Sequence, residues 1–147
     1  MMIIRKAEQK DIPSIYNLVV ELAVFENEPE AVTTQINDYE NNFGEGLFEA
    51  IVAEQNGRIL AMALYYMTFS TWKGRMLYIE DFVVTKSARK KGIGQLIFDA
   101  VILEAKKKKA KLLKWQVLDW NKPAISFYKK NNAIIEKDWY NGKLMLE

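Results

Sequence analysis

Hydrophobic residues recur along the chain at two spacings, and each spacing is typical of one kind of element. A repeat of three to four residues marks the apolar face of an amphipathic helix that packs on a core. This repeat predicts helices over residues 12–25, 33–43, 93–104 and 123–130. Asp11 and Asn121 stand where they can cap the first and the last of these helices.

Alternating hydrophobic residues and turn-forming pairs predict the strands. Strands are expected over residues 2–6, 48–53, 59–68, 76–84 and 112–118, with a closing hairpin made by residues 134–136 and 143–146. Asn56-Gly57 and Asn141-Gly142 are pairs that favour a tight hairpin turn. The resulting order β-α-α-β-β-β-α-β-α-β-β indicates an α/β fold with a mixed central sheet flanked by helices. With neither a repeat nor a linker in the sequence, residues 1–147 are expected to form a single domain.

Composition narrows the chemistry that such a domain can perform. The 147 residues include no cysteine and no histidine. This excludes disulfides, a cysteine nucleophile, Ser-His-Asp catalysis and the usual zinc sites, so we expect no metal. Proton transfer must then come from Asp, Glu, Lys, Tyr or water. The net charge of +2 is too small to indicate nucleic-acid binding by itself.

The apolar runs and the N-terminus bear on where the protein works. No apolar run is long enough to cross a bilayer. Residues 1–6 are predicted to be a short strand, without the apolar stretch and cleavage site of a signal peptide. We therefore expect a cytoplasmic protein that does not associate with membranes.

The segment Arg89-Lys90-Lys91-Gly92-Ile93-Gly94 lies between a predicted strand and a predicted helix. Free N–H groups at a helix start, with the helix dipole, form an anion site. Glycine lets a ligand approach the backbone closely, and the three basic residues add positive charge, so the segment suits a pyrophosphate. It lacks the Lys-Ser/Thr of a Walker A loop and the third glycine of a dinucleotide fingerprint. An ordinary helix start with a solvated basic turn is the alternative.

Three stretches, in this order along the chain, resemble the GNAT acetyltransferase superfamily. Tyr78-Ile79-Glu80-Asp81-Phe82-Val83-Val84 resembles the central strand of that family, and Arg-x-x-Gly-x-Gly at residues 89–94 resembles its coenzyme A pyrophosphate loop. Residues 120–128, Trp-Asn-Lys-Pro-Ala-Ile-Ser-Phe-Tyr, resemble the segment that carries its Asn and Tyr. The resemblance covers nearly the whole chain and implies an N-acetyltransferase with acetyl-CoA as cosubstrate.

Two further stretches are similar to the diamine branch of this superfamily, which contains spermidine/spermine and thialysine acetyltransferases. They are residues 21–26, Glu-Leu-Ala-Val-Phe-Glu, and residues 65–75. The polyamine enzyme typically has an aspartate where this chain has Ser70, and residues 70–75 and 118–121 are closer to the thialysine enzyme. The resemblance therefore implies a small diamine-like or thialysine-like primary amine as acceptor, and a homodimer.

The resemblance also implies roles for individual residues. Glu80 is expected to take the acceptor's proton through water, because an alkylammonium with a pKa of about 10.4 cannot attack while protonated. Tyr128 is the candidate general acid for the departing thiolate, and Glu26, Trp72 and Asp81 are the candidate acceptor-binding residues. Because side chains alternate along a strand, Glu80 and Asp81 are expected to point to opposite faces.

Coenzyme A is expected to contact the end of the central strand, the glycine-bearing loop and one asparagine. The candidate cofactor-binding residues are Phe82, Val83, Val84, Arg89, Lys90, Lys91, Gly92, Ile93, Gly94, Gln95 and Asn121. Each candidate side chain also has a purely structural interpretation. Tyr128 is then a core tyrosine, Asn121 a helix cap, Trp72 a packing residue and Glu26 a solvated helix-end charge. Glu80 or Asp81 then only pairs with a nearby cation.

Three other functions are compatible with the same residues. A protein or peptide amine acetyltransferase needs a wider acceptor groove. A non-catalytic acetyl-CoA-binding module has the same fold but does not need Glu80, Asn121 and Tyr128 together. Nucleic-acid binding rests on the lysines of residues 106–111, which we expect instead to be a solvated helix end, stabilised by the negative end of the helix dipole.

Overall fold

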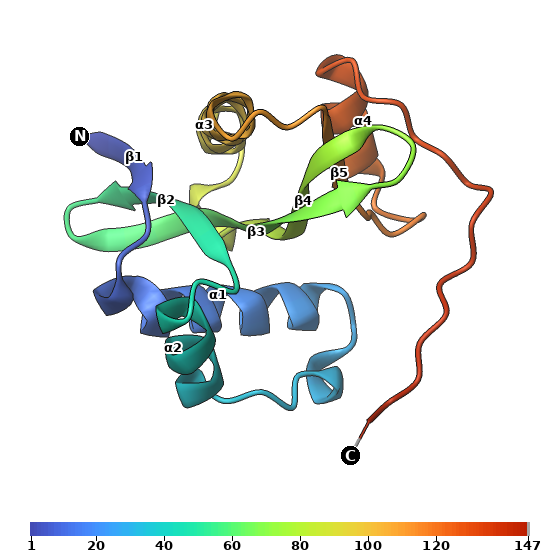
Figure 1. The fold of residues 1–147 in the computed structure, drawn as a ribbon. Coiled ribbons are helices and arrows are strands. Elements are labelled where there is room, and N and C mark those ends of the chain that lie inside the picture. Colours follow the sequence, from blue (N-terminus) through green and yellow to red (C-terminus); the bar gives the residue numbers. More distant parts are fainter. Residues whose placement is uncertain (147) are drawn as a thin grey trace. The chain divides into compact units, whose positions relative to one another are not determined.

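The structure is a computed structural model that describes residues 1–146, and it divides into two compact units (Figure 1). These units are Met1–Trp115 and Gln116–Glu147. In the first unit the strands are β1 (Met2–Lys6), β2 (Glu49–Gln55), β3 (Arg58–Ser70), β4 (Gly74–Val84) and β5 (Leu112–Trp115). Its α-helices are α1 (Ile12–Phe25), α2 (Ile36–Gly44) and α3 (Ile93–Lys107), and its short 3-10 helices are η1 (Gln9–Asp11), η2 (Pro29–Ala31) and η3 (Lys86–Ala88).

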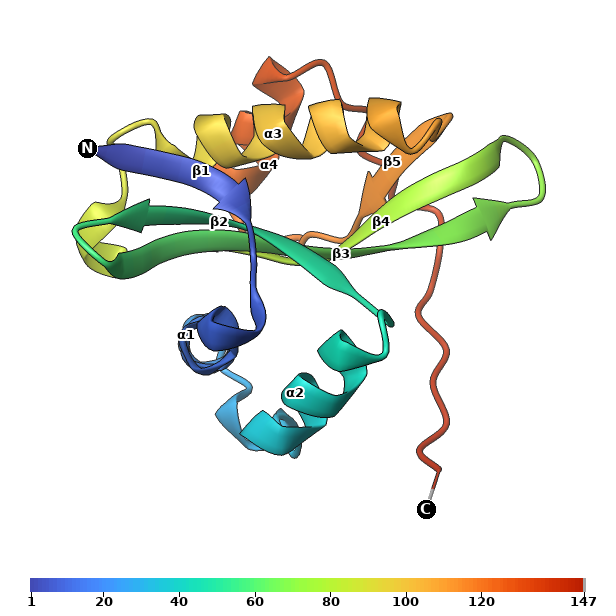
Figure 2. The ribbon, with the colours of Figure 1, turned by 60° about the vertical axis from the view of Figure 1, so that its left-hand side comes forward.

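The five strands form one sheet in the order β1-β2-β3-β4-β5. The first three pairs are antiparallel, whereas β4 and β5 are parallel, so the sheet is mixed. Figures 1 and 2 show α3 on one face of this sheet and α1 and α2 on the other. This arrangement confirms the predicted α/β fold with a mixed sheet flanked by helices.

Each face of the sheet buries the apolar stripe of a helix. Under α1, the core contains Ile12, Ile15, Leu18, Val52, Met62, Leu64 and Val83. On the other face α3 buries Ile93, Ile97 and Val101, which recur every four residues. Burying one such side chain stabilises the fold by about 1.5–3 kcal/mol, so these stripes fix both helices on the sheet.

Most predicted elements match the structure, with differences of a few residues at their ends. The turn at Asn56-Gly57 has the positive φ angles, 53° and 78°, that its hairpin requires. α2 begins at Ile36 and not at residue 33 or 34, because the Gln35 N–H donates to the Asp38 carboxylate in a capping box (2.8 Å). Within residues 1–146, no helix has both the length and the apolar content needed to cross a membrane.

Asp11 is the N-cap residue of α1, as predicted, but its side chain makes no cap hydrogen bond. The Asp11 carboxylate instead accepts hydrogen bonds from Arg5 Nη1 (2.7 Å) and Nη2 (3.0 Å). It also accepts one from the Glu8 N–H (2.7 Å). Asp11 is only 5% exposed, and the bonded Arg5 guanidinium lowers its pKa. The residue therefore joins β1 to the start of α1.

Replacing Asp11 by Asn is expected to lower the free energy of unfolding by about 2 to 3 kcal/mol, because charge-assisted hydrogen bonds are lost. Since the folded-state pKa lies below the ordinary value of 3.8, the loss is full at neutral pH and shrinks as the pH falls below that value. Denaturant unfolding at several pH values measures it. The exposed Asp138→Asn variant is the control, and equal stabilities of the two variants would contradict the prediction.

The predicted closing hairpin is wrong. In the second unit, α4 (Lys122–Lys130) forms as expected, but residues 133–146 form neither helix nor strand. Six of their apolar side chains are at least three-quarters exposed: Ile134, Trp139, Tyr140, Leu144, Met145 and Leu146. A two-stranded hairpin is marginal by itself. Because most of its apolar residues are exposed, the turn signal at Asn141-Gly142 does not produce one.

Candidate active site

A β-bulge in β4 decides where the two central carboxylates point. Leu64 pairs with Asp81, but the next residue of β3, Tyr65, pairs with Ile79, so Glu80 is the extra residue. Tyr66 then pairs with Tyr78. A bulge of this kind breaks the alternation of faces along the strand that carries it.

As a result, Glu80 and Asp81 lie on the same face, and the prediction of opposite faces is wrong. Asp81 shares a face with its partner Leu64, which belongs to the core under α1. Glu80 accepts a hydrogen bond from the hydroxyl of Tyr66 (3.0 Å), which lies two residues from Leu64 and therefore on the same face. Both carboxylates are thus directed to the α1 side of the sheet.

Asp81 contributes to an acidic cavity of about 190 Å³ on this side. Two other carboxylate residues, Glu26 and Glu28, stand in the cavity wall just beyond the end of α1. Its remaining lining is apolar: Val19, Leu22, Ala23, Ala31 and Val32. The cavity therefore combines negative charge with apolar walls, which suits the ammonium group and the methylene chain of an alkylamine.

Burial and neighbouring carboxylates act on the charge of Asp81. Burial, and then the negative charges of Glu80 and Glu26, raise the pKa of Asp81 to about 6. Burial also raises the pKa of Glu26. Carboxylates held together against their own repulsion gain energy when a cation enters between them. This is the electrostatic property expected of an amine-binding site.

Two tyrosines of the sheet flank Glu80, and sequence reasoning missed both. The rings of Tyr66 and Tyr78 stack with centroids 5.6 Å apart. Burial, followed by the hydrogen bond to Glu80, raises the pKa of Tyr66 to about 12. The sequence signal was the run Tyr65-Tyr66, but only the pairing register shows which of the two faces Glu80.

Trp72, the third candidate acceptor residue, does not line the cavity. It lies in the turn between β3 and β4 and is 84% exposed. In the same turn the Lys73 N–H donates to the Ser70 hydroxyl (3.1 Å). The structure thus brings together Glu26, Asp81 and Glu80, and leaves Trp72 outside this group.

The glycine-bearing loop joins η3 to α3 through two left-handed residues. Lys90 and Gly92 have φ angles of 65° and 80°, and Gly92 is the N-cap of α3. The left-handed conformation favours glycine at this position. The first N–H groups of α3 follow it directly, as at any helix start, and their binding of an anion stays a prediction.

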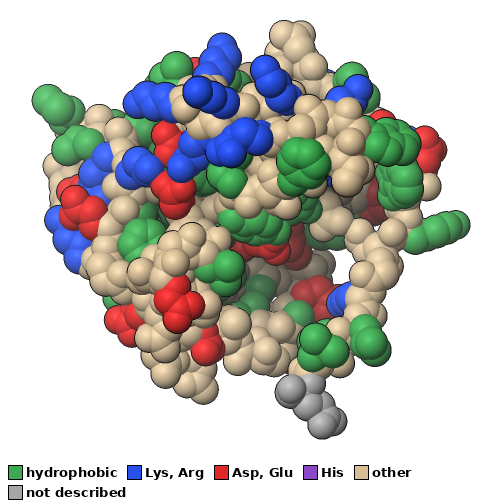
Figure 3. Space-filling model, in the orientation of Figure 1, with side chains coloured by type: hydrophobic (Ala, Val, Ile, Leu, Met, Phe, Trp, Pro, Cys, Tyr) green, Lys and Arg blue, Asp and Glu red, His purple; other side chains and the backbone are tan. Residues whose placement is uncertain are grey.

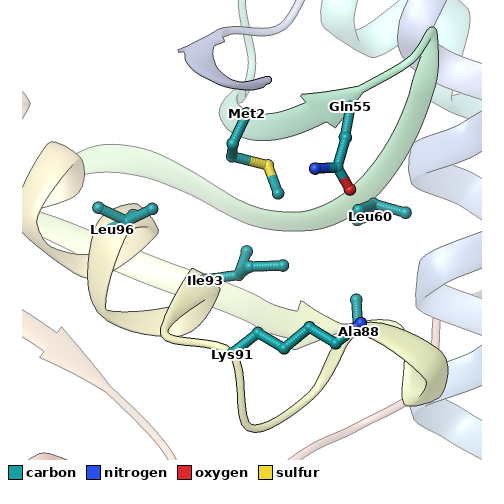
Figure 4. Close-up of a pocket in the computed structure, with 7 residues that line it drawn as sticks. All are labelled: Met2, Gln55, Leu60, Ala88, Lys91, Ile93 and Leu96. Carbon is teal, nitrogen blue, oxygen red and sulfur yellow. The ribbon is translucent and has the colours of Figure 1, made fainter.

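The basic side chains of this loop are placed differently from one another. The Nε of Arg89 donates to the Val84 carbonyl (3.0 Å), and its Nη2 lies 3.8 Å from Glu21. Lys91 extends toward Ala88 beside a second cavity, of about 280 Å³ (Figure 4). The other residues that line this cavity are Met2, Gln55, Leu60, Ile93 and Leu96. Lys90 is exposed.

The end of β4, next to the loop, extends beyond the part of the strand that pairs with β5. β5 pairs with β4 only over Met76–Ile79. Among the described residues, therefore, no strand pairs with Phe82, Val83 and Val84 on that edge. A Cβ built on Gly94 would lie 3.8 Å from Val84 Cγ2 and 3.9 Å from Phe82 Cζ, so the start of α3 packs on this strand end. Gln95, one residue on, hydrogen-bonds Asp99 (2.9 Å).

Asn121 and Tyr128 belong to the second unit. The Asn121 side chain accepts a hydrogen bond from the Ala124 N–H (3.4 Å), so it caps α4 as predicted. Tyr128, near the other end of α4, is 7% exposed, and burial raises the pKa of its phenol to about 12. The phenol is therefore protonated at neutral pH.

The lysines near the end of α3 are partly engaged. Figure 3 shows Lys and Arg side chains gathered over this part of the first unit. Lys106 and Lys107 occupy the last turn of α3, where the dipole favours them. The Lys108 Nζ, however, is 2.8 Å from Glu49, which also contacts Lys6 (2.6 Å). The expected solvated helix end is thus in part an ion-pair network.

This fold and loop are those of a known class of enzyme. The acetyltransferase (GNAT) family model matches residues 12–133. The chain therefore belongs to the GNAT acetyltransferase family, and it is an N-acetyltransferase that uses acetyl-CoA as its acetyl donor.

Several acetyltransferases are similar to this chain in sequence. The chain is 36% identical to the thialysine N-epsilon-acetyltransferase of Bos taurus over 140 residues, which cover 88% of this chain and 82% of that protein. For the Mus musculus protein of the same name the identity is 35%, covering 86% and 80%. The human spermidine/spermine N(1)-acetyltransferase-like protein 1 is 32% identical over 93% of this chain, which spans only 21% of that longer protein.

Solved structures show the same fold. An aminoglycoside acetyltransferase from an uncultured soil metagenomic sample superposes with a TM-score of 0.82 at 16% identity, covering 99% of this chain and 97% of the other. A tetramutant Bacillus halodurans protein gives a TM-score of 0.78 at 24% identity, covering 97% and 99%. At these identities the likeness establishes the fold and not the acceptor.

Proposed function

We propose that the protein transfers an acetyl group from acetyl-CoA to the primary amine of a small diamine-like or thialysine-like acceptor. The observation that carries this proposal is the acidic cavity beside α1, in which Glu26, Glu28 and Asp81 meet apolar walls. Such a cavity favours an ammonium group on a short methylene chain. The named thialysine acetyltransferases among the similar sequences support the same acceptor class.

Ser70 supports a short acceptor over a long polyamine. A long dication needs carboxylates at both ends of its site. Where the resemblance places an aspartate in polyamine enzymes, this chain has a hydroxyl that accepts a hydrogen bond from the Lys73 N–H inside the turn. With no carboxylate at this position, the site is expected to suit a compact amine.

The residues of the chain divide the proposed chemistry between them. The loop N–H groups and the edge of β4 at Phe82–Val84 would hold acetyl-CoA, with Asn121 as a further contact. Glu80 takes the ammonium proton through water, and the neutral amine attacks the thioester carbon. As the carbon–sulfur bond breaks, Tyr128 gives its proton to the thiolate. The net products are the acetylated amine, coenzyme A and the proton removed from the ammonium.

The test is coenzyme A release from acetyl-CoA in the presence of single amines. The panel contains thialysine, lysine, spermidine, spermine, short diamines and an amine-bearing peptide. We expect the highest kcat/KM for thialysine or a short diamine. Preference for the peptide would favour a protein acetyltransferase. Acetyl-CoA binding without release for any amine would favour a non-catalytic binding module.

We propose further that the chain acts as one domain and assembles as a homodimer. The match to the family model runs through both compact units, which supports a single domain. The exposed apolar residues between 134 and 146 form a surface that a second copy could cover. Light scattering at micromolar concentration tests the assembly, and a mass equal to one chain would contradict it.

A further inference from the structure

The C-terminal half of α1 contacts the segment that leads into the glycine-bearing loop. The Thr85 hydroxyl donates to Glu21 Oε1 (2.8 Å), and the Lys86 N–H donates to Glu21 Oε2 (3.0 Å). The same Oε2 lies 3.8 Å from Arg89 Nη2. The Glu21 side chain thus contacts three residues of the connection between β4 and α3.

The other side of this helix half forms the acidic cavity. Leu22 and Ala23 line that cavity, and Glu26 follows the last residue of α1. The Arg89 guanidinium lies over the ring of Phe25, 5.2 Å from the ring centroid. About one and a half turns of helix therefore touch the loop on one side and the acceptor cavity on the other.

The partners of Arg89 bear on its role. Its Nε is bound to the Val84 carbonyl, and its charge faces Glu21 and the Phe25 ring. These contacts run from the end of β4 to α1. Arg89 thereby links the loop to β4 and α1, and Glu21 supplies the negative charge that pairs with Arg89.

We propose that Glu21 is a positioning residue that couples acetyl-CoA binding to acceptor binding by fixing the glycine-bearing loop to α1. This inference rests on the proposed function, because it takes the loop as the donor site and the cavity as the acceptor site. When either ligand binds and makes its own site more rigid, α1 makes the site of the other ligand more rigid as well. Such coupling is reciprocal, so each ligand tightens the binding of the other by the same factor.

The test compares Glu21→Ala and Glu21→Gln with the wild-type enzyme. Alanine keeps the helix but removes all three contacts. Glutamine keeps groups that can hydrogen-bond Thr85 and Lys86 and removes only the charge facing Arg89. We expect Glu21→Ala to raise the KM for acetyl-CoA about 10-fold, with kcat changed less than about threefold, and Glu21→Gln to lie between it and wild type.

Calorimetric titration of coenzyme A, with and without saturating amine, measures the coupling itself. In the wild type we expect the amine to tighten coenzyme A binding, and in Glu21→Ala we expect this factor to fall to about one. Glu30→Ala removes an exposed acidic side chain of η2 and is the matched control, expected to keep the wild-type factor.

Three results would overturn the proposal. The first is that the amine does not change coenzyme A affinity in the wild type, and the second is that it changes this affinity in Glu21→Ala as much as in the wild type. The third is that the loss of coenzyme A affinity in Glu21→Ala is accompanied by an equal loss of kcat and a lower unfolding midpoint. These titrations need no turnover. Absence of coenzyme A release by the wild type would therefore reject the proposed function, while the affinities still decide whether Glu21 positions the loop.

Discussion

Replacing Tyr128 by Phe is expected to lower kcat by about 100- to 10,000-fold and to leave acetyl-CoA affinity nearly unchanged. The substitution removes one hydroxyl and keeps the buried ring. Without that hydroxyl, the sulfur must leave as an unprotonated thiolate or wait for water. Steady-state kinetics and coenzyme A titration of the same preparation measure the two quantities.

The pH dependence separates this role from a structural one. Because burial raises the pKa of Tyr128 to about 12, the phenol stays protonated across the range in which the enzyme is assayed. The defect of Tyr128→Phe should therefore be constant with pH. Tyr140→Phe removes the hydroxyl of a fully exposed tyrosine of the same unit and should behave as wild type. Wild-type turnover by Tyr128→Phe at every pH would show that Tyr128 is a core tyrosine only.

Replacing Asp81 by Asn is expected to stabilise the protein and to weaken acceptor use. Asp81 is ionised at neutral pH although burial, Glu80 and Glu26 all oppose its charge. Removing the charge should raise the free energy of unfolding by up to about 3 kcal/mol at pH 7, the equivalent of the pKa shift. It should lower kcat/KM for the amine about 10- to 100-fold, because a buried ion pair with the ammonium is lost.

The sign of the pH effect follows from the raised pKa. The ionised form costs stability in the folded state, and this cost is absent below 3.8, the ordinary value. The cost grows as the pH rises toward about 6 and is constant above it. The stability advantage of Asp81→Asn should therefore be largest at neutral pH and vanish near pH 4.

Denaturant unfolding and kinetics with the best amine measure these two effects. Asp138→Asn, an exposed carboxylate of the second unit, should change neither quantity. A destabilised Asp81→Asn with unchanged acceptor kinetics would show that Asp81 supports the fold and does not bind the amine.

The sequence determined the main elements because their signals are local. The four-residue repeat of Ile93, Ile97 and Val101 indicates a helix, and Asn56-Gly57 indicates a tight turn. The glycine-bearing segment likewise predicted a helix start with its N–H groups, and Gly92 is the N-cap of α3. These features depend on residues that are close together in the sequence, so they can be identified from a single sequence.

The side of the sheet to which Glu80 and Asp81 point was decided only by the tertiary structure. Alternation along β4 predicted opposite faces, and the bulge opposite Leu64 and Tyr65 placed both carboxylates under α1. A bulge depends on how two strands align across a turn, which no local pattern in either strand specifies. The coupling between Glu80, Asp81 and Glu26 follows from that alignment.

The same distinction holds for the ends of the chain and for the loop. Asn141-Gly142 has the local signal of a hairpin, but a two-stranded hairpin is marginal by itself, and most apolar side chains of residues 134–146 are exposed. Arg89 was identified correctly as part of the loop, but its contacts with Glu21 and Phe25 come from a helix more than sixty residues away. The sequence by itself determined most of the elements, and all of the chemical groups, that this protein has. The tertiary structure decided which of those groups meet, because long-range pairing and burial, and not local propensity, set the distances between them.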